Sequence, residues 1–250
     1  MLQIHSIELT NICNLSCAHC PSKQSVYPRG LITLKTFEQA VKATATAGQT
    51  LIIISGFGES LIHPQLTELF AIAKQHGTYI SLPTNGILLT EEKLAHLIEN
   101  NLVQLEISIH TEKSLAAFQM AYTYINNYKA PVKLVGNMMS CYNPNIKQWA
   151  VSQNVPVEIL KHVVVVDIHN WARNERPFTQ KENNKWQARC RFLKYDVCVV
   201  RWDGKVLTCC ADSEGVNYIG MIDAFATLKH DKTKYKLCYK CSPAWFTDIS

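Results

Sequence analysis

Ten cysteines are distributed unevenly along this 250-residue chain, and two groups of them have spacings suited to metal chemistry. In the first group, Cys13, Cys17 and Cys20 form a C-x-x-x-C-x-x-C pattern. Free cysteines seldom cluster in this way without a metal or redox role. Three thiolates do not complete a tetrahedral zinc site, but they can hold three irons of a [4Fe–4S] cluster. The fourth iron would then be open to a substrate or cofactor.

The second group of cysteines lies near the other end of the chain. Cys190 and Cys209 flank a segment that contains Gly204, and a C-x-x-C pair follows at Cys238 and Cys241. Four thiols can close an iron–sulfur cluster completely, but they can equally bind one zinc ion. Spacing alone does not separate these two possibilities.

Three further cysteines have no obvious partners. Cys198 and Cys210 alternate with predicted strand positions, and Cys141 stands alone. We expect Cys198 and Cys210 to be packed thiols, because free cysteine behaves as a small hydrophobic residue, and Cys141 to be a core or loop thiol.

Between the two cysteine groups, short apolar segments alternate with amphipathic ones. The apolar segments predict strands, at residues 4–9, 50–55, 78–83, 102–110, 130–138 and 155–161. The amphipathic segments predict helices, at residues 33–48, 64–77, 90–101, 112–128 and 143–154. Repeated β-then-α units form a parallel sheet whose ligands bind beyond the carboxyl ends of the strands. We therefore expect an α/β fold, a partial (β/α)6 barrel open along one side, with the first cysteine group on its ligand-binding face.

The alternation of apolar and amphipathic segments ends at about residue 168. Residues 197–210 predict a β-hairpin with Asp203-Gly204 as its tight turn. We expect two domains, a partial barrel over residues 1–168 and a small β-hairpin/helix subdomain over residues 169–250.

The composition of the chain is that of a globular protein without membrane-spanning or secretory segments. Hydrophobic residues make up 47% and charged residues 18% of the chain, which is ordinary for a globular protein. No apolar run reaches membrane-spanning length, and the first residues lack the features of a signal peptide. We expect a cytoplasmic protein with no membrane partner. A net charge of +5 with scattered basic residues gives no argument for nucleic acid.

The N-terminal cysteine motif resembles that of the radical S-adenosylmethionine (radical SAM) superfamily, with His19 in its usual aromatic position. "SGFGES" at 55–60 is similar to the family's G-G-E-P motif, although the first Gly and the Pro are replaced. "TNG" at 84–86 and "SIH" at 108–110 follow predicted strands, as in relatives. The resemblance implies a SAM-binding [4Fe–4S] cluster on the three cysteines. It also implies S-adenosylmethionine contacts from His19, Gly58, Glu59, Asn85 and Ser108.

The C-terminal cysteines resemble the SPASM/Twitch appendage of one branch of this superfamily. The resemblance implies a second, auxiliary [4Fe–4S] cluster on Cys190, Cys209, Cys238 and Cys241, with zinc as the alternative. "HNWARN" at 169–174 resembles the bridge to that appendage.

Together these resemblances imply an oxidoreductase that reductively cleaves S-adenosylmethionine to a 5′-deoxyadenosyl radical, which abstracts hydrogen from a substrate. A flavodoxin- or ferredoxin-type donor would supply the electron. The short appendage resembles that of dehydrogenases that oxidise small sugar-like molecules, so we expect net two-electron oxidation of a small molecule. The first predicted strand begins by residue 4, so we expect no leader-binding domain before it, which disfavours a peptide substrate.

Two alternatives to this function stay open: a peptide- or protein-modifying radical SAM enzyme, and a non-catalytic zinc or iron–sulfur protein. The catalytic residues are unknown. Arg173 and His169, in the predicted bridge, are weak candidates, and His110 is a third.

Overall fold

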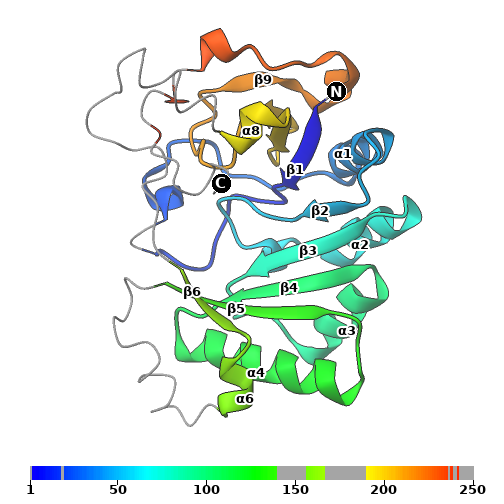
Figure 1. Ribbon diagram of the computed structural model, residues 1–250, viewed down its shortest axis with the longest axis vertical. Coiled ribbons are helices and arrows are strands. Elements are labelled where there is room, and N and C mark those ends of the chain that lie inside the picture. Colours follow the sequence, from blue (N-terminus) through cyan, green and yellow to red (C-terminus); the bar gives the residue numbers. More distant parts are fainter. Residues whose placement is uncertain are drawn as a thin grey trace.

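The computed structural model describes residues 2–17, 20–139, 156–166, 190–235, 237–238 and 241. Within these residues the strands form a single sheet with the order β6-β5-β4-β3-β2-β1-β7-β8-β9 (Figure 1). The strands are β1 (Gln3–Ile7), β2 (Leu51–Ile53), β3 (Tyr79–Thr84), β4 (Leu102–Ser108), β5 (Lys133–Met139), β6 (Val163–Val166), β7 (Val197–Val200), β8 (Lys205–Leu207) and β9 (Tyr218–Met221). The α-helices are α1 (Leu34–Thr46), α2 (Leu66–Gln75), α3 (Glu91–Glu99), α4 (Glu112–Asn127), α6 (Val157–Leu160) and α8 (Arg191–Lys194).

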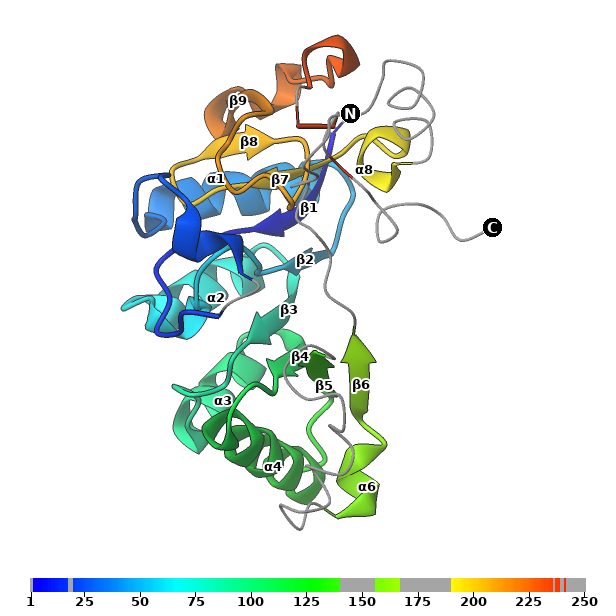
Figure 2. The same ribbon diagram turned by 90° about the vertical axis from the view of Figure 1, so that its left-hand side faces the viewer.

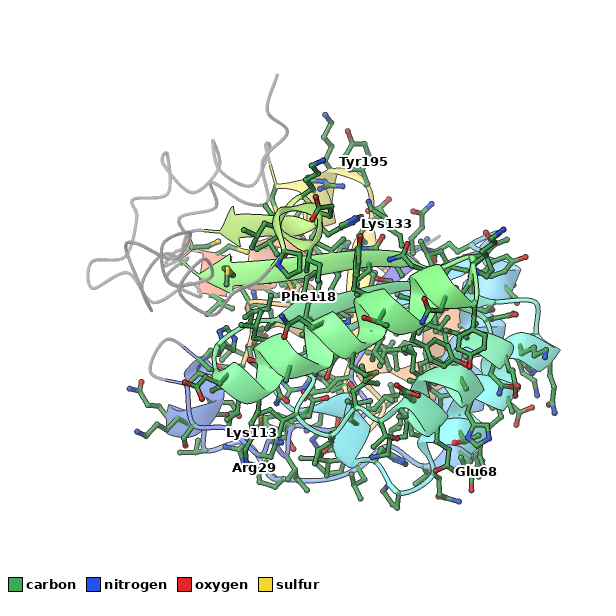
Figure 3. All side chains as sticks on the ribbon, turned by 90° about the horizontal axis from the view of Figure 1, so that it is seen from below. Arg29, Glu68, Lys113, Phe118, Lys133 and Tyr195 are labelled. Atoms are coloured by element: carbon green, nitrogen blue, oxygen red, sulfur yellow. The ribbon has the colours of Figure 1, made fainter. Side chains whose placement is uncertain are left out.

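Strands β1 to β6 pair in parallel, and this confirms the predicted partial barrel. Helices α1 to α4 lie on the outer side of the curved sheet (Figure 2). Figure 3 shows α4 running beside the strands, with Phe118 between helix and sheet. A Cβ atom on Gly136 of β5 would come within 3.1 Å of the Phe118 ring, so the glycine lets the helix pack closely.

The predicted helix starts are confirmed by their caps. The side chains of Thr33, Thr90 and Thr111 accept hydrogen bonds from backbone N–H groups in the first turns of α1, α3 and α4. Gly48 and Gly77, just after α1 and α2, have φ of 74° and 68°, the left-handed conformation that favours glycine at a helix end.

The predicted sixth strand at residues 155–161 is wrong. Residues Val157–Leu160 form the short helix α6, which begins after Pro156. The strand follows at Val163–Val166 and pairs with β5. Proline favours the first turn of a helix, whereas the run of β-branched valines favours a strand. The predicted helix at 143–154 lies outside the described residues.

The predicted hairpin is confirmed, and it belongs to the same sheet as the barrel. β7 and β8 are antiparallel around Asp203 and Gly204, and Gly204 has φ of 82°. On its other edge β7 pairs in parallel with β1, and β9 adds a third strand to the hairpin. The proposed domain boundary between residues 168 and 169 lies outside the described residues.

One hydrophobic core spans both ends of the chain. Ile4 and Ile7 of β1 belong to the same buried cluster as Val200, Val206 and Phe225 from the C-terminal part. No helix in the described part of the chain is both long and apolar enough to cross a membrane.

Candidate functional site

The three N-terminal cysteines line a cavity of about 210 Å³, here called the N-terminal thiol cavity. The other walls come from residues that follow β2 and β3 and from the end of β4. The structure thus brings together most of the predicted site, namely Cys13, Cys17, Cys20, Gly58, Glu59, Asn85 and Ser108. His110 also lines the cavity. His19 lies outside the described residues.

The loop that carries Cys13 is anchored on both sides. Before it, the Asn11 side chain donates to the carbonyl of Pro28 at 2.7 Å and accepts the N–H of Gly30 at 3.0 Å. After it, the Cys13 Sγ accepts the N–H of Leu15 at 3.4 Å. Burial raises the pKa of the Cys13 thiol, and nearby negative charges raise it further. A cation would therefore be needed to hold this thiol as a thiolate, which is what a coordinating metal does.

Gly58 is required by the chain itself. A Cβ atom there would lie 2.3 Å from the carbonyl oxygen of Thr10 and 2.6 Å from that of Ile12. The N–H of the next residue, Glu59, donates to the Ile12 carbonyl at 2.8 Å. The loop after β2 therefore presses directly against the backbone that leads into Cys13. The glycine permits a close approach of two backbone segments, and Gly58 also lines the N-terminal thiol cavity.

Glu59 is a buried carboxylate that joins two loops. Its Oε1 accepts the N–H of Leu61 at 3.0 Å and the hydroxyl of Thr84 at 2.7 Å. Its Oε2 accepts the N–H of Asn85 at 2.8 Å. Burial raises the pKa of Glu59, and these hydrogen bonds lower it. A carboxylate offers about four acceptor positions, so these bonds leave one on Oε2.

Two residues of this site were missed by the sequence analysis. Thr84 bonds Glu59, and Asn14 accepts the side-chain N–H of Asn85 at 2.7 Å. The second contact connects the Cys13 loop to the loop after β3. Both residues could have been found from their positions in the sequence, because each is next to a predicted site residue: Asn14 follows Cys13, and Thr84 precedes Asn85.

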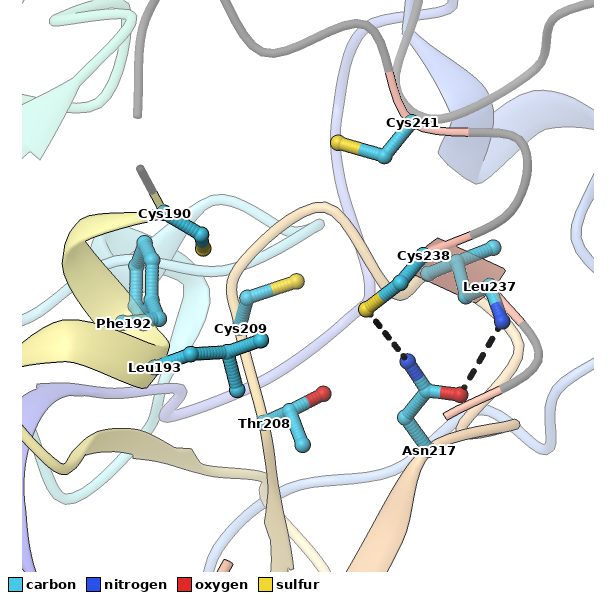
Figure 4. Close-up of a pocket in the computed structure, with 9 residues that line it drawn as sticks. All are labelled: Cys190, Phe192, Leu193, Thr208, Cys209, Asn217, Leu237, Cys238 and Cys241. Atoms are coloured by element: carbon cyan, nitrogen blue, oxygen red, sulfur yellow. Dashed lines mark hydrogen bonds between the residues drawn. The ribbon is translucent and has the colours of Figure 1, made fainter. Parts of the chain in front are cut away.

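Cys190, Cys209, Cys238 and Cys241 line a second site, here called the C-terminal thiol pocket. Figure 4 shows their four sulfur atoms around a common space. Asn217 braces the pocket: its side-chain N–H donates to the Cys238 Sγ at 3.8 Å, and its oxygen accepts the N–H of Leu237 at 3.1 Å.

The C-terminal thiols affect one another electrostatically. Burial, followed by the charges of neighbouring cysteines, raises the pKa of Cys241 to about 12. Burial raises the pKa of Cys209 well above its usual range. None of the nine residues that line the pocket is basic. Among the described residues, no three His, Cys, Asp or Glu side chains are placed to hold one metal ion.

The remaining cysteines and the catalytic candidates have different positions. Cys198 is completely buried on β7, where its thiol donates to the Gln3 carbonyl at 3.4 Å. Cys210 is partly buried, and burial raises its pKa to about 12. Cys141, His169 and Arg173 lie outside the described residues.

Comparison with known proteins places this geometry in a family. A family model described as "Radical SAM superfamily" matches residues 7–130. An AdoMet-dependent heme synthase of Methanosarcina barkeri is 35% identical over 103 residues. That match covers 41% of this chain and only 29% of the synthase.

Solved structures share the fold over nearly the whole chain. The structure of BtrN in complex with AdoMet and 2-DOIA has a TM-score of 0.59 at 17% identity, covering 96% of this chain and 87% of BtrN. Native anSMEcpe with bound AdoMet and the Kp18Cys peptide has a TM-score of 0.64 at 15% identity, with 96% and 84% covered. The solved structures show that the fold is shared, and the three-cysteine motif together with the family model shows that the chain belongs to the radical SAM superfamily.

Proposed function

We propose that this protein is a radical SAM oxidoreductase that oxidises a small molecule by two electrons. The observation that carries the proposal is the pairing of two thiol sites on one sheet. Cys13, Cys17 and Cys20 share a cavity with Glu59, Asn85 and Ser108, and four further thiols surround a second pocket. One site suits the generation of a radical, and the other suits the acceptance of an electron.

The first site is proposed to hold a [4Fe–4S] cluster and S-adenosylmethionine. Three thiolates leave one iron open, as this cofactor requires. When bound, the groups supply a 5′-deoxyadenosyl radical that takes one hydrogen atom from the substrate. The substrate then loses a proton and a second electron. An external flavodoxin- or ferredoxin-type donor is proposed to supply the reducing electron.

The chain's own residues are proposed to orient S-adenosylmethionine. Glu59 can accept one N–H of the cofactor's amino group with the acceptor position left on Oε2, and its bonds to Leu61, Thr84 and Asn85 fix that direction. Asn85 and Ser108 are proposed to bind the carboxylate or ribose. His19, Arg173 and His169 remain proposals from the sequence.

The second site is proposed to hold an auxiliary [4Fe–4S] cluster. A cluster spreads its four thiolate ligands over four irons, whereas zinc draws them to about 2.3 Å from one point. The four sulfurs surround a common space, and among the described residues no three metal-binding side chains are placed to hold one ion, which supports the cluster over zinc. The N–H donated from Asn217 to Cys238 is of the kind that tunes cluster potentials.

A second candidate function is peptide or protein modification, favoured by the shared fold of anSMEcpe, which was solved with a peptide. The third is a non-catalytic metal protein that uses its cysteines for zinc or iron–sulfur binding. The substrate of the heme synthase is no guide, because the match covers a small part of that protein.

The decisive measurement is iron, sulfide and zinc per chain after anaerobic reconstitution, in wild type and in a Cys13/Cys17/Cys20→Ala variant. We expect about eight irons falling to about four. A fall from about four irons to none, with one zinc retained, would make the C-terminal site structural. The proposed electron acceptor would then be lost.

Activity separates the enzyme from the non-catalytic alternative. Reduced, reconstituted protein is expected to release 5′-deoxyadenosine from S-adenosylmethionine, and the Cys13/Cys17/Cys20→Ala variant is expected not to. Deuterium transfer into 5′-deoxyadenosine from labelled candidates, small molecules against peptides, would identify the substrate. Absence of cleavage in protein that holds both clusters would contradict the enzyme proposal.

A further inference from the structure

A buried ion pair lies between the two thiol sites. Glu8 follows β1 and Arg201 follows β7, and the side chains are 2% and 3% exposed. Arg201 Nε contacts Glu8 Oε2 directly. A buried ion pair gives weak net stability in most proteins, so its retention here calls for another explanation.

The pair lines a small central cavity whose lining overlaps the linings of both thiol sites. This central cavity shares Ser55, Gly56 and Phe57 with the N-terminal thiol cavity. It shares Cys209 with the C-terminal thiol pocket. Any charge fixed there acts on whatever is bound on either side, and low-dielectric surroundings strengthen the effect.

The positive end of the pair faces the cysteine loop. Arg201 Nη1 donates to the carbonyls of Asp212 and Ser213 at 3.1 and 3.3 Å. The N–H of Asp212 in turn approaches the carbonyl of Cys209 at 3.5 Å. Arg201 is therefore linked through the loop backbone to one of the proposed cluster ligands.

The negative end faces the N-terminal thiol cavity. Glu8 Oε1 accepts the N–H of Phe57 at 3.5 Å, and a Cβ atom on Gly56 would lie 2.3 Å from the Glu8 side chain. Glu8 and Arg201 both line the central cavity together with Cys209, and Arg201 also lies 5.4 Å from the centre of the Phe57 ring, so both charges are held in fixed positions beside the C-terminal thiols.

Two other acidic side chains lie near the pair, and one of them, Asp212, also interacts electrostatically with Arg201 and adds to the effect of burial in raising the pKa of Cys209. The Asp212 carboxylate accepts the N–H groups of Val216 and Asn217 at 2.9 and 2.7 Å. Asp203 accepts the Tyr27 hydroxyl at 2.6 Å and pairs with Lys205. Arg201 is the buried cation of this region among the described residues, lying 4.2 Å from the Tyr27 ring centre.

We propose that the Arg201–Glu8 pair sets the reduction potential of the cluster held by the C-terminal thiols. Arg201 raises the potential, since a nearby cation favours the reduced, more negative cluster, and Glu8 moderates that effect. Arg201 is a positioning and tuning residue, because it acts through its charge and through its hydrogen bonds to the loop backbone. The inference rests on the proposed auxiliary cluster.

The test is a redox titration followed by electron paramagnetic resonance, in the full chain with Cys13/Cys17/Cys20→Ala so that only the auxiliary cluster is observed. At about pH 8, Arg201→Met made in a Glu8→Gln background, where residue 8 stays uncharged, is expected to weaken reduction about tenfold relative to Glu8→Gln alone, a fall of about 59 mV for one electron. Glu8→Gln is expected to shift the potential in the opposite direction. Arg201→Lys, which keeps the charge, is expected to stay closer to wild type than Arg201→Met.

A general loosening of the fold would not shift the reduction potential in opposite directions when the two partners of one ion pair are replaced. Shifts of the same sign, or no shift, would overturn the proposal. If Arg201→Met does not fold, Glu8→Gln and Arg201→Lys still decide it. Lys205→Met is the matched control: it removes an exposed cation of the same hairpin, and little shift is expected. If the background variant binds no iron, the proposed auxiliary cluster itself fails.

Discussion

Gly58 and Glu59 shape the N-terminal thiol cavity in different ways. Gly58 brings the loop after β2 against the backbone of residues 10–12, where a side chain would collide with carbonyl oxygens. Glu59 then ties that loop to the loop after β3 through buried hydrogen bonds. Together they fix the distance between the Cys13 loop and the proposed cofactor contacts.

Replacement of Gly58 by alanine is expected to disturb the cluster site directly. The new Cβ would meet backbone atoms, which cannot rotate away, so the loop before Cys13 must shift. We expect a loss of about 1–3 kcal/mol in stability and weaker retention of iron at the N-terminal site. Iron per chain and urea unfolding are the measurements.

Gly48→Ala is the matched control for Gly58→Ala. Nothing lies within 4 Å of a Cβ at Gly48, although its φ of 74° disfavours alanine. This variant should lose about 1 kcal/mol of stability while its iron content stays at the wild-type level. Equal iron loss in both variants would show that general destabilisation, and not the loop contact, releases the cluster.

Glu8 is expected to make stability depend on pH. Burial raises the pKa of Glu8 to about 7, although the ion pair with Arg201 opposes the rise. The folded state therefore binds this proton more tightly than the unfolded state, whose value is near 4.5. The stabilisation is complete below about pH 4.5 and is lost as pH rises through about 7.

The measurement is the free energy of unfolding of reconstituted protein between about pH 6 and pH 8. Wild type should lose about 1 kcal/mol relative to Glu8→Gln over this range, because glutamine does not titrate. If the free energy of unfolding of wild type and of Glu8→Gln changed in parallel with pH, the raised pKa of Glu8 would be contradicted.

Some elements of the fold can be predicted from the sequence and others cannot. Strand and helix types follow from local patterns, and the caps at Thr90 and Thr111 lie where the residue type predicts. The predicted position of the sixth strand is wrong because two apolar segments, one helical and one extended, follow each other without a break. Pro156 marks the start of the helical one. The pairing of β1 with β7 leaves no local trace, since it joins opposite ends of the chain.

The same limit applies to the site. The cysteine motifs and the loops after strands can be predicted from the sequence because each motif is contiguous. Their proximity can also be predicted, because parallel strands bring their carboxyl ends together. The contacts of Arg201 with Glu8 and with the Asp212 loop depend on the β1–β7 pairing, so no local pattern contains them.

Cys198 tests the role of β7 as a core strand. Its thiol is completely buried in the shared core. Burial raises its pKa to about 12, so it should remain protonated. We expect Cys198→Ala to cost about 1–2 kcal/mol through the cavity it leaves, with iron and sulfide unchanged. Cys209→Ala is the comparison and should lose the C-terminal iron. Iron loss in Cys198→Ala would make Cys198 a ligand.

At the scale of the whole molecule, the C-terminal part completes the barrel sheet. β7 pairs with β1, and Val200, Val206 and Phe225 enter the same buried cluster as Ile4 and Ile7. Removal of the C-terminal part would expose the edge of β1 and leave Glu8 without its buried cation. Such losses are costly, because an unpaired buried charge destabilises by several kcal/mol. The two thiol sites therefore belong to one structural unit.

The final prediction is that the chain unfolds as one cooperative unit. Four of the five tryptophans lie after residue 168, whereas α1 to α4 lie within residues 34–127. Tryptophan emission therefore reports mainly the C-terminal part, and far-ultraviolet circular dichroism reports mainly the barrel helices. After a jump into concentrated urea under anaerobic conditions, both signals should change with one common rate constant, because the shared sheet and core must break together. Two separate rates, with tryptophan emission changing first, would mean that the C-terminal part opens independently and that the β1–β7 pairing does not hold the two thiol sites together.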